Sequence, residues 1–277
     1  MIDAVVRLIA ISFISILCVA ALLFGVRQFG LSQPHAALVH PLLQSSPLLI
    51  IKPPADRSDY PSLAYFKDIS AQWPKALFWI KVTVKDNGNA YVISPEQAQR
   101  LRMGRPRSAN DQEKSETPEL ELVTLVNALP PNSQFYLEFI DPDPARASRI
   151  IEIIPKLNLE QRIIFTSPNQ EPLDYLRREK PFWVFAMAPA KLMQLKLLSS
   201  LFIESIAKIK QDILVSPLNV KGQKLITKRL LDEIHRRHKI YILESNAGLD
   251  STPDWLAGKI DGIATEKPEI FLEYFKK

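Results

Sequence analysis

One carboxylate, Glu138, lies inside an apolar and aromatic segment, residues 134–141 (QFYLEFID). Its neighbours Phe135, Tyr136 and Phe139 are typical of a buried strand. An ionised carboxylate is costly to bury, so Glu138 needs a cation, hydrogen-bond donors or water close to it. Glu138 is therefore the first candidate for a binding group, and the segments around it must supply its partner.

Further polar side chains end the later predicted strands: Ser216, Glu244, Ser245, Asn246, Thr265 and Glu266. The carboxyl ends of barrel strands are where such folds build their active sites. Glu244 and Asn246 are therefore candidates to line a ligand pocket, with helix capping or loop closure as the alternative role.

Two histidines, His235 and His238, lie three residues apart on a predicted helix, close enough to share a metal ion. Arg236, Arg237 and Lys239 surround them, and a cationic last turn fits the helix dipole better than a metal site does. We assign no metal ligands and no cofactor to the chain.

Short apolar segments alternate with amphipathic ones from residue 48 onward. The predicted strands cover residues 48–52, 77–84, 135–140, 162–167, 182–187, 212–217, 240–245 and 262–265, and residues 90–94 return after the turn Asp86-Asn87-Gly88. The first predicted helix is capped by Ser62. The later ones cover residues 145–157, 171–180, 190–210, 224–238, 253–259 and 269–277.

Helices between strands require parallel crossovers, so eight such units predict a (β/α)8 TIM barrel. An open, doubly wound sheet is the alternative. That fold normally carries a glycine-rich turn after its first strand, where this chain has Pro53-Pro54.

The N-terminal segment, residues 8–26, has no charged residue and as a helix could cross a hydrocarbon core of roughly 30 Å. We expect an uncleaved anchor over residues 1–27, because Gly25 is followed by Val26 and Arg27 rather than by small residues of a signal cleavage site. Residues 28–46 are expected to be a tether and residues 47–277 the barrel. The flanking charges weakly favour a bacterial-type inner membrane protein with an extracytoplasmic barrel.

The net charge of +5 comes from 35 basic and 30 acidic residues spread along the chain, which disfavours nucleic acid and suits an anionic membrane surface. The single cysteine, Cys18, excludes an intrachain disulfide. The polar residues 100–118 are expected to be a loop. Its arginines, Arg100, Arg102, Arg105 and Arg107, are expected to face solvent, with lipid head groups as the alternative.

The predicted helix at residues 190–210 is unusually apolar, which core packing explains best. The alternative is a face for the membrane or a partner, beside Lys191, Lys196, Lys208 and Lys210.

The order of segments from residue 48 to the C-terminus resembles the glycerophosphodiester phosphodiesterase family, a (β/α)8 barrel akin to phosphatidylinositol-specific phospholipase C. The similar segments are LEFI, TPELELVTLV, LNLEQRIIFTSPNQEPLDYLR, HKIYILESN and IDGIATEKPEIFLEYF. The resemblance implies cleavage of glycerol phosphodiesters by two histidines and a divalent cation that carboxylates hold.

The matching positions of this chain lack that chemistry. Lys52, Pro53 and Pro54 occupy the positions of the family's first histidine motif. The positions of its acidic metal ligands hold Tyr60, Trp79 and Lys81. Ser94 and Pro95 occupy the positions of the second histidine and the acidic residue after it. Only Glu138 is retained, and one carboxylate cannot hold a cation that wants six or more oxygens. The resemblance therefore implies a degenerate active site.

Two positions near the family's cation have become lysines. We hypothesise that Lys52 and Lys81 bring their ammonium groups to Glu138; the alternative is that both extend to solvent. The expected function is a membrane-anchored barrel that has lost metal-dependent hydrolysis and binds a phosphate, lipid head group or partner. The rivals are a phosphoric diester hydrolase with non-standard residues, a Schiff-base enzyme using Lys52 or Lys81, and a structural scaffold. The sequence indicates no oligomeric state.

Overall fold

The computed structural model describes residues 2–44, 47–54, 60–103, 120–220, 222–247, 252–256 and 258–275. Within these ranges, parallel strands form a barrel in the order β7-β6-β5-β2-β1-β12-β11-β8. They are β1 (Leu48–Ile51), β2 (Leu77–Val84), β5 (Gln134–Phe139), β6 (Ile163–Thr166), β7 (Val184–Phe185), β8 (Ile213–Ser216), β11 (Ile240–Glu244) and β12 (Gly262–Thr265). A parallel bridge between Ala186 and Ile213 joins β7 to β8. The predicted (β/α)8 barrel is confirmed, and the open-sheet alternative is wrong.

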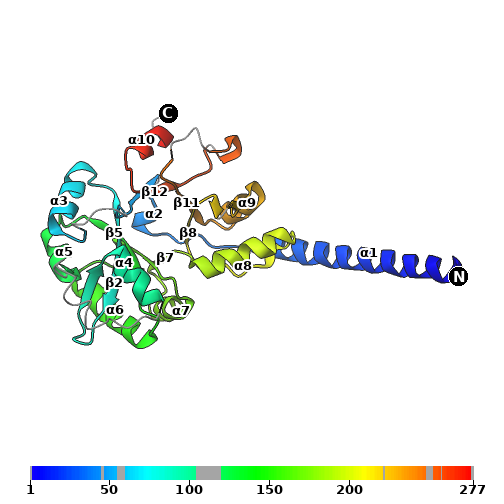
Figure 1. Ribbon diagram of the computed structural model, residues 1–277, viewed down its shortest axis with the longest axis horizontal. Coiled ribbons are helices and arrows are strands. Elements are labelled where there is room, and N and C mark those ends of the chain that lie inside the picture. Colours follow the sequence, from blue (N-terminus) through cyan, green and yellow to red (C-terminus); the bar gives the residue numbers. More distant parts are fainter. Residues whose placement is uncertain are drawn as a thin grey trace.

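Helices surround the strands (Figure 1). They are α3 (Leu63–Gln72), α5 (Leu122–Ala128), α6 (Pro144–Lys156), α7 (Gln170–Glu179), α8 (Pro189–Ser200), α9 (Lys228–Arg236) and α10 (Ile270–Phe275), with the short 3-10 helices η2 (Glu204–Ile206) and η4 (Asp254–Leu256). Side-chain caps start several of them. Ser62 accepts a hydrogen bond from the Tyr65 amide, and Thr227 accepts one from the Leu230 amide.

Three predicted helices were too long. Where a helix was expected over residues 253–259, the described residues form only the 3-10 helix η4. The helix expected over residues 190–210 ends at Ser200, because Phe202 adopts a left-handed φ of 62° that cannot continue it. The helix expected from residue 224 begins at Lys228. The residues before it form a small hairpin of β9 (Asn219–Val220) and β10 (Gln223–Lys224).

The hairpin after β2 is confirmed, with β3 (Ala90–Ile93) antiparallel to β2 and β4 (Leu120–Glu121) pairing with β3. Part of the polar loop expected at residues 100–118 is helical instead. Helix α4 (Pro95–Arg102) starts at Ser94 in a capping box with Gln97, so Arg100 and Arg102 are helical residues. Arg105 and Arg107 lie outside the described residues.

Alternate side chains of the strands fill the barrel, as parallel strands buried on both faces require. The interior layer is apolar: Leu48, Ile50, Leu77, Tyr136, Ile164, Val184, Ala186, Ile213, Ile242 and Ala264. Separate apolar clusters lie between the strands and the surrounding helices. The interior polar groups therefore gather beyond this layer, at the carboxyl ends of the strands.

The segment expected to be a tether packs against the barrel. Helix α2 (Pro41–Gln44) places Leu42, 1% exposed, in the interior apolar cluster. His40 is buried, burial lowers the pKa of its imidazole, and its Nδ1 accepts a hydrogen bond from the Leu42 amide. His40 is buried because the apolar leucines around it pack against the barrel.

The N-terminal helix α1 (Ile2–Ser32) continues past residue 27, the expected end of the anchor, and projects from the barrel (Figure 1). Its segment Ala10–Ser32 is long and apolar enough to span a membrane.

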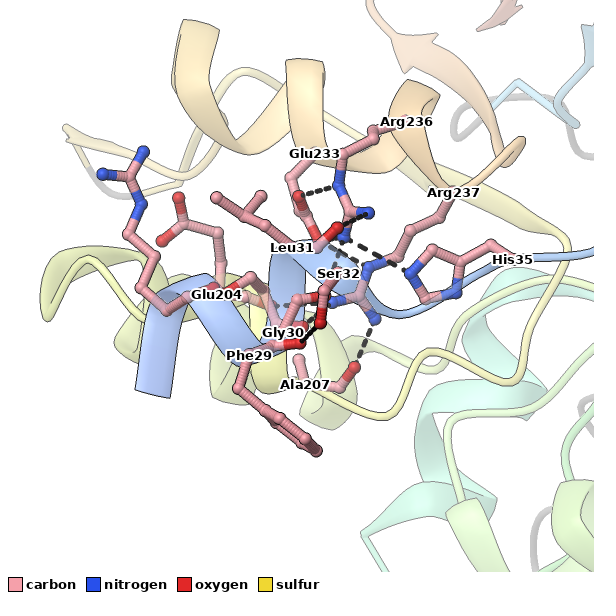
Figure 2. A network of polar contacts seen from close by, with 12 residues as sticks. Phe29, Gly30, Leu31, Ser32, His35, Glu204, Ala207, Glu233, Arg236 and Arg237 are labelled. Atoms are coloured by element: carbon pink, nitrogen blue, oxygen red, sulfur yellow. Dashed lines mark hydrogen bonds and ion pairs between the residues drawn. The ribbon is translucent and has the colours of Figure 1, made fainter. Parts of the chain in front are cut away.

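The C-terminal end of α1 is docked on η2 and α9 (Figure 2). Ser205 Oγ donates a hydrogen bond of 3.0 Å to the Arg27 carbonyl, and Arg236 donates to the carbonyls of Gly30 and Leu31. Gly30 allows this close approach, because a Cβ atom there would lie 2.5 Å from the backbone of Ser205. The C-terminal end of α1 is therefore packed against the barrel.

Candidate functional site

Glu138 lies near the carboxyl end of β5, directly beside Lys81 in the parallel register of β5 and β2. Its side chain is 8% exposed. Lys81 Nζ and Trp79 Nε1 each donate a hydrogen bond of 3.0 Å to Glu138 Oε2, and Arg102 Nη2 donates to Oε1. Both carboxylate oxygens are thus occupied by donors of the chain itself.

Arg102 was not a predicted site residue, and its expected exposure to solvent is only partly correct. Helix α4 carries it over the barrel, where it contacts Glu138 while 39% of its side chain stays exposed. The signal that could have found it is the Ser94-Pro95 helix start with Gln97 in the third position. That start places the last turn of a short helix near the strand ends.

Lys52 does not reach Glu138 in the way we hypothesised. Its Nζ lies 2.6 Å from Glu244 Oε1 and 3.9 Å from Glu266 Oε1, and 5.5 Å from the centre of the Trp79 ring. The reason is local charge: two carboxylates follow the strands on that side, whereas two cations already satisfy Glu138. Lys81 does bring its ammonium group to Glu138, as we hypothesised, with Nζ 3.0 Å from Oε2.

Trp79 lies between the two ionic groups at the barrel mouth. Its indole N–H donates to Glu138, and its ring face lies beneath Lys52. Below it, the Tyr136 ring packs at a centroid distance of 4.6 Å. Burial raises the pKa of the Tyr136 phenol, which keeps it neutral. The rings of Trp79 and Tyr136 thus form a layer between the charged residues of the mouth and the apolar interior of the barrel.

Asn246 closes a loop at the mouth. Its side-chain oxygen accepts hydrogen bonds from the Glu266 amide, at 2.9 Å, and from Thr265 Oγ1, at 3.2 Å. This is the loop-closing role that the sequence left open for Asn246, and it holds Glu266 beside Lys52.

The residues at the family's histidine and acidic positions have structural roles where their contacts are described. Ser94 caps α4, Pro95 is its first residue, and Tyr60 is buried among aromatic rings. His235 Nε2 lies 3.1 Å from Asp261 Oδ2.

The donor set does not fit the divalent cation that the fold family implies. Glu138 presents its oxygens to Lys81, Trp79 and Arg102, so a cation there would face two positive side chains. Glu244 and Glu266 share Lys52. Within the described ranges, no three His, Cys, Asp or Glu side chains are grouped as metal ligands.

An open depression lies outside the mouth, between the β2–β3 turn and α6. Its lining includes Lys85, Asp86, Arg146 and Arg149 and none of the candidate site residues. The chemistry of the mouth is therefore separate from this surface feature.

Several solved structures with a similar barrel carry the name glycerophosphodiester phosphodiesterase. The glycerophosphoryl diester phosphodiesterase domain of an uncharacterized protein from Mycobacterium tuberculosis aligns with a TM-score of 0.59 at 14% identity, over 81% of this chain and 97% of that one. The glycerophosphodiester phosphodiesterase from Agrobacterium tumefaciens aligns with a TM-score of 0.54 at 12% identity, over 83% and 99%.

A third structure, a phosphodiesterase from Oleispira antarctica in complex with the product sn-glycerol-3-phosphate, aligns with a TM-score of 0.57 at 11% identity, over 85% and 99%. No protein-family model and no curated protein matches the sequence. At these identities the likeness defines the fold, so the chain has the barrel fold of the glycerophosphodiester phosphodiesterases.

Proposed function

We propose that this chain is a single-pass membrane protein whose barrel has lost metal-dependent phosphodiester hydrolysis and binds a phosphate-bearing ligand at its mouth. The barrel is on the extracytoplasmic side of a bacterial-type inner membrane. The observation that supports this most is the neutralisation of Glu138 by Lys81 and Arg102. The side-chain cations of Lys81 and Arg102 occupy the place where the family binds a divalent metal ion.

Charge at the mouth favours an anion on one side. Lys81 and Arg102 outnumber Glu138, two cations to one anion, whereas Lys52 faces two carboxylates. The Arg102 side chain is 39% exposed and the Lys81 side chain 17%, so donors of both can still reach a ligand. A guanidinium fork with an ammonium group beside it is a common arrangement for phosphate.

Retention of the N-terminal helix is supported by its docking. The carbonyls of Arg27, Gly30 and Leu31 accept hydrogen bonds from Ser205 and Arg236, contacts that removal of a signal peptide near residue 25 would disturb. The helix is therefore proposed to remain as the anchor.

Binding is tested with full-length protein in lipid nanodiscs by isothermal titration calorimetry. The probe is sn-glycerol-3-phosphate, the ligand of the Oleispira antarctica protein. We expect saturable binding that Arg102→Gln weakens about tenfold or more, the loss of a charge-assisted contact worth about 1.4 kcal/mol. Arg149→Gln on α6, outside the mouth, is the control. Absence of binding contradicts the proposal and favours a structural scaffold.

Catalysis is tested separately with glycerophosphodiesters in the presence of Ca²⁺ or Mg²⁺. We expect no turnover above a protein-free control. Turnover that Glu138→Ala abolishes would show an active hydrolase and overturn the proposal. Borohydride trapping with small carbonyl compounds tests the lysine enzyme; a covalent adduct on Lys52 or Lys81 would establish Schiff-base chemistry instead.

A further inference from the structure

Five large apolar side chains are exposed where α1 meets the barrel. They are Phe29, Leu197, Leu201, Phe202 and Ile206, with exposed fractions of 67%, 62%, 50%, 60% and 39%, and are called the apolar face below. Leu197 and Leu201 are four residues apart and so lie on one side of the end of α8. The opposite side of α8 carries the buried Leu192 and Leu195. Core packing therefore explains the apolar residues Leu192 and Leu195 but not the exposed Leu197 and Leu201.

The apolar face lies at the level where α1 would leave a membrane. The uncharged run of α1 ends at Val26, and η2 docks on the following turn through the bond from Ser205 to Arg27. One residue of helix advances about 1.5 Å, so η2 lies within roughly one turn of that end. Ile206 belongs to η2, and Leu201 and Phe202 directly precede it.

The face is held in place rather than loosely attached. Figure 2 shows Arg237 reaching the carbonyl of Ala207, the residue that follows η2, while Arg236 contacts the end of α1. The Arg229 guanidinium stacks on the Phe202 ring at 3.9 Å. The exposed apolar side chains therefore keep a fixed position relative to α1.

Positive charge adjoins the face. Lys208 and Lys210 are exposed in the segment after η2. Lysines beside exposed apolar side chains are typical of a surface that lies in the interface of a bilayer with anionic lipids.

We propose that the apolar face inserts into the head-group region of the bilayer that α1 spans, as a second membrane contact of the barrel. This inference rests on the proposed anchoring by α1. The occupant is the lipid surface because the face continues the apolar surface of α1 and carries lysines at its edge.

The test is electron paramagnetic resonance depth measurement on the full chain in nanodiscs of phosphatidylcholine with phosphatidylglycerol. Nitroxide labels are placed, one at a time, through Leu201→Cys, Ile206→Cys, Ile16→Cys and Arg149→Cys in a Cys18→Ser background. Ile16 lies within α1, and Arg149 on the exposed surface of α6 is the aqueous control.

We expect the labels at 201 and 206 to lose accessibility to a water-soluble nickel chelate and gain accessibility to oxygen relative to the label at 149. If the label at 16 is inside the bilayer but those at 201 and 206 match 149, the apolar face is not a membrane contact although the anchor stands. If the label at 16 is aqueous, the anchor itself fails and the inference falls with it. Dipolar broadening at 201 would instead identify contact with a second copy and overturn the inference.

Discussion

Lys81 Nζ and Glu138 Oε2 lie 3.0 Å apart at directly paired positions of two adjacent parallel strands. Paired positions on parallel strands point to the same side of a sheet, so the contact follows from the barrel register. The consequence is an acid inside the barrel mouth whose charge is balanced by the neighbouring strand.

Removing Lys81 should destabilise the fold measurably. Breaking a buried ion pair usually costs about 3–5 kcal/mol, and we expect Lys81→Met to lose somewhat less because Arg102 and Trp79 still contact Glu138. Denaturant unfolding in detergent measures the loss. The matched control is Lys52→Met, whose partners are more exposed, with an expected effect of about 1 kcal/mol or less. Equal effects of the two variants would contradict this account.

Adding Glu138→Gln to the Lys81→Met variant should recover part of the lost stability, because a neutral amide costs less to bury than a carboxylate that keeps only the half-exposed Arg102 as its ionic partner. The same unfolding measurement applies. A double variant that is less stable than Lys81→Met alone would show that the contacts of the carboxylate with Arg102 and Trp79 outweigh the cost of burying its charge.

Gly30→Ala should weaken the docking of α1. Its Cβ would lie 2.5 Å from the Ser205 backbone, and such overpacking typically costs about 1–3 kcal/mol. We expect faster hydrogen exchange at the end of α1 and in η2, measured by mass spectrometry. Gly25→Ala is the control, because no atom lies within 4 Å of its added Cβ. Unchanged exchange in Gly30→Ala would mean that α1 is not packed on η2.

Acid should loosen the same junction through His35. Burial, followed by the charges of Arg237 and Arg236, lowers the pKa of His35 from its ordinary 6.5. The folded state therefore disfavours the protonated imidazole, so the stabilisation is complete above about pH 6.5 and declines as the pH falls through the folded-state pKa. Thermal unfolding in detergent from about pH 7.5 to about pH 5.5 should show the decline. The slope should become shallower in His35→Gln; an identical slope would exclude His35 as its source.

A second acid transition should come from Glu233. Burial acts to raise its pKa, but hydrogen bonds from Arg236 and Arg237 outweigh burial and hold the pKa below its ordinary 4.5. The stabilisation is therefore present above about pH 4.5 and is lost as the pH falls through the lowered pKa. Glu233→Gln should remove this transition while lowering stability at neutral pH, because it leaves Arg237, 3% exposed, without its charge partner. A transition that persists in this variant would belong to another carboxylate.

The strand pattern predicted the barrel because parallel strands buried on both faces give apolar runs with a clear start and end. Glu138 stood out for the same reason, as a charge within such a run, and Lys81 is its register neighbour. Lys52 was assigned to the wrong acid because its partner depends on which carboxylates follow β11 and β12, a matter of side-chain reach that spacing does not encode.

Arg102 and the packing of residues 33–44 escaped prediction for a different reason. Both belong to short, irregular segments whose position is set by contacts with the finished barrel rather than by local periodicity. Leu42 enters the interior cluster, and Arg102 reaches Glu138 from a helix two turns long. Propensity and hydrophobic pattern carry little information about such long-range docking.

The close contact between Gly30 and the backbone of Ser205 limits how the barrel can move relative to α1 if α1 crosses a bilayer. Because no flexible linker separates the end of α1 from the barrel, the mouth would keep a fixed height and tilt above the lipid. Its main motion would be lateral diffusion in the membrane plane. Ligands would then have to come to the mouth, since the protein could not reach out to collect them.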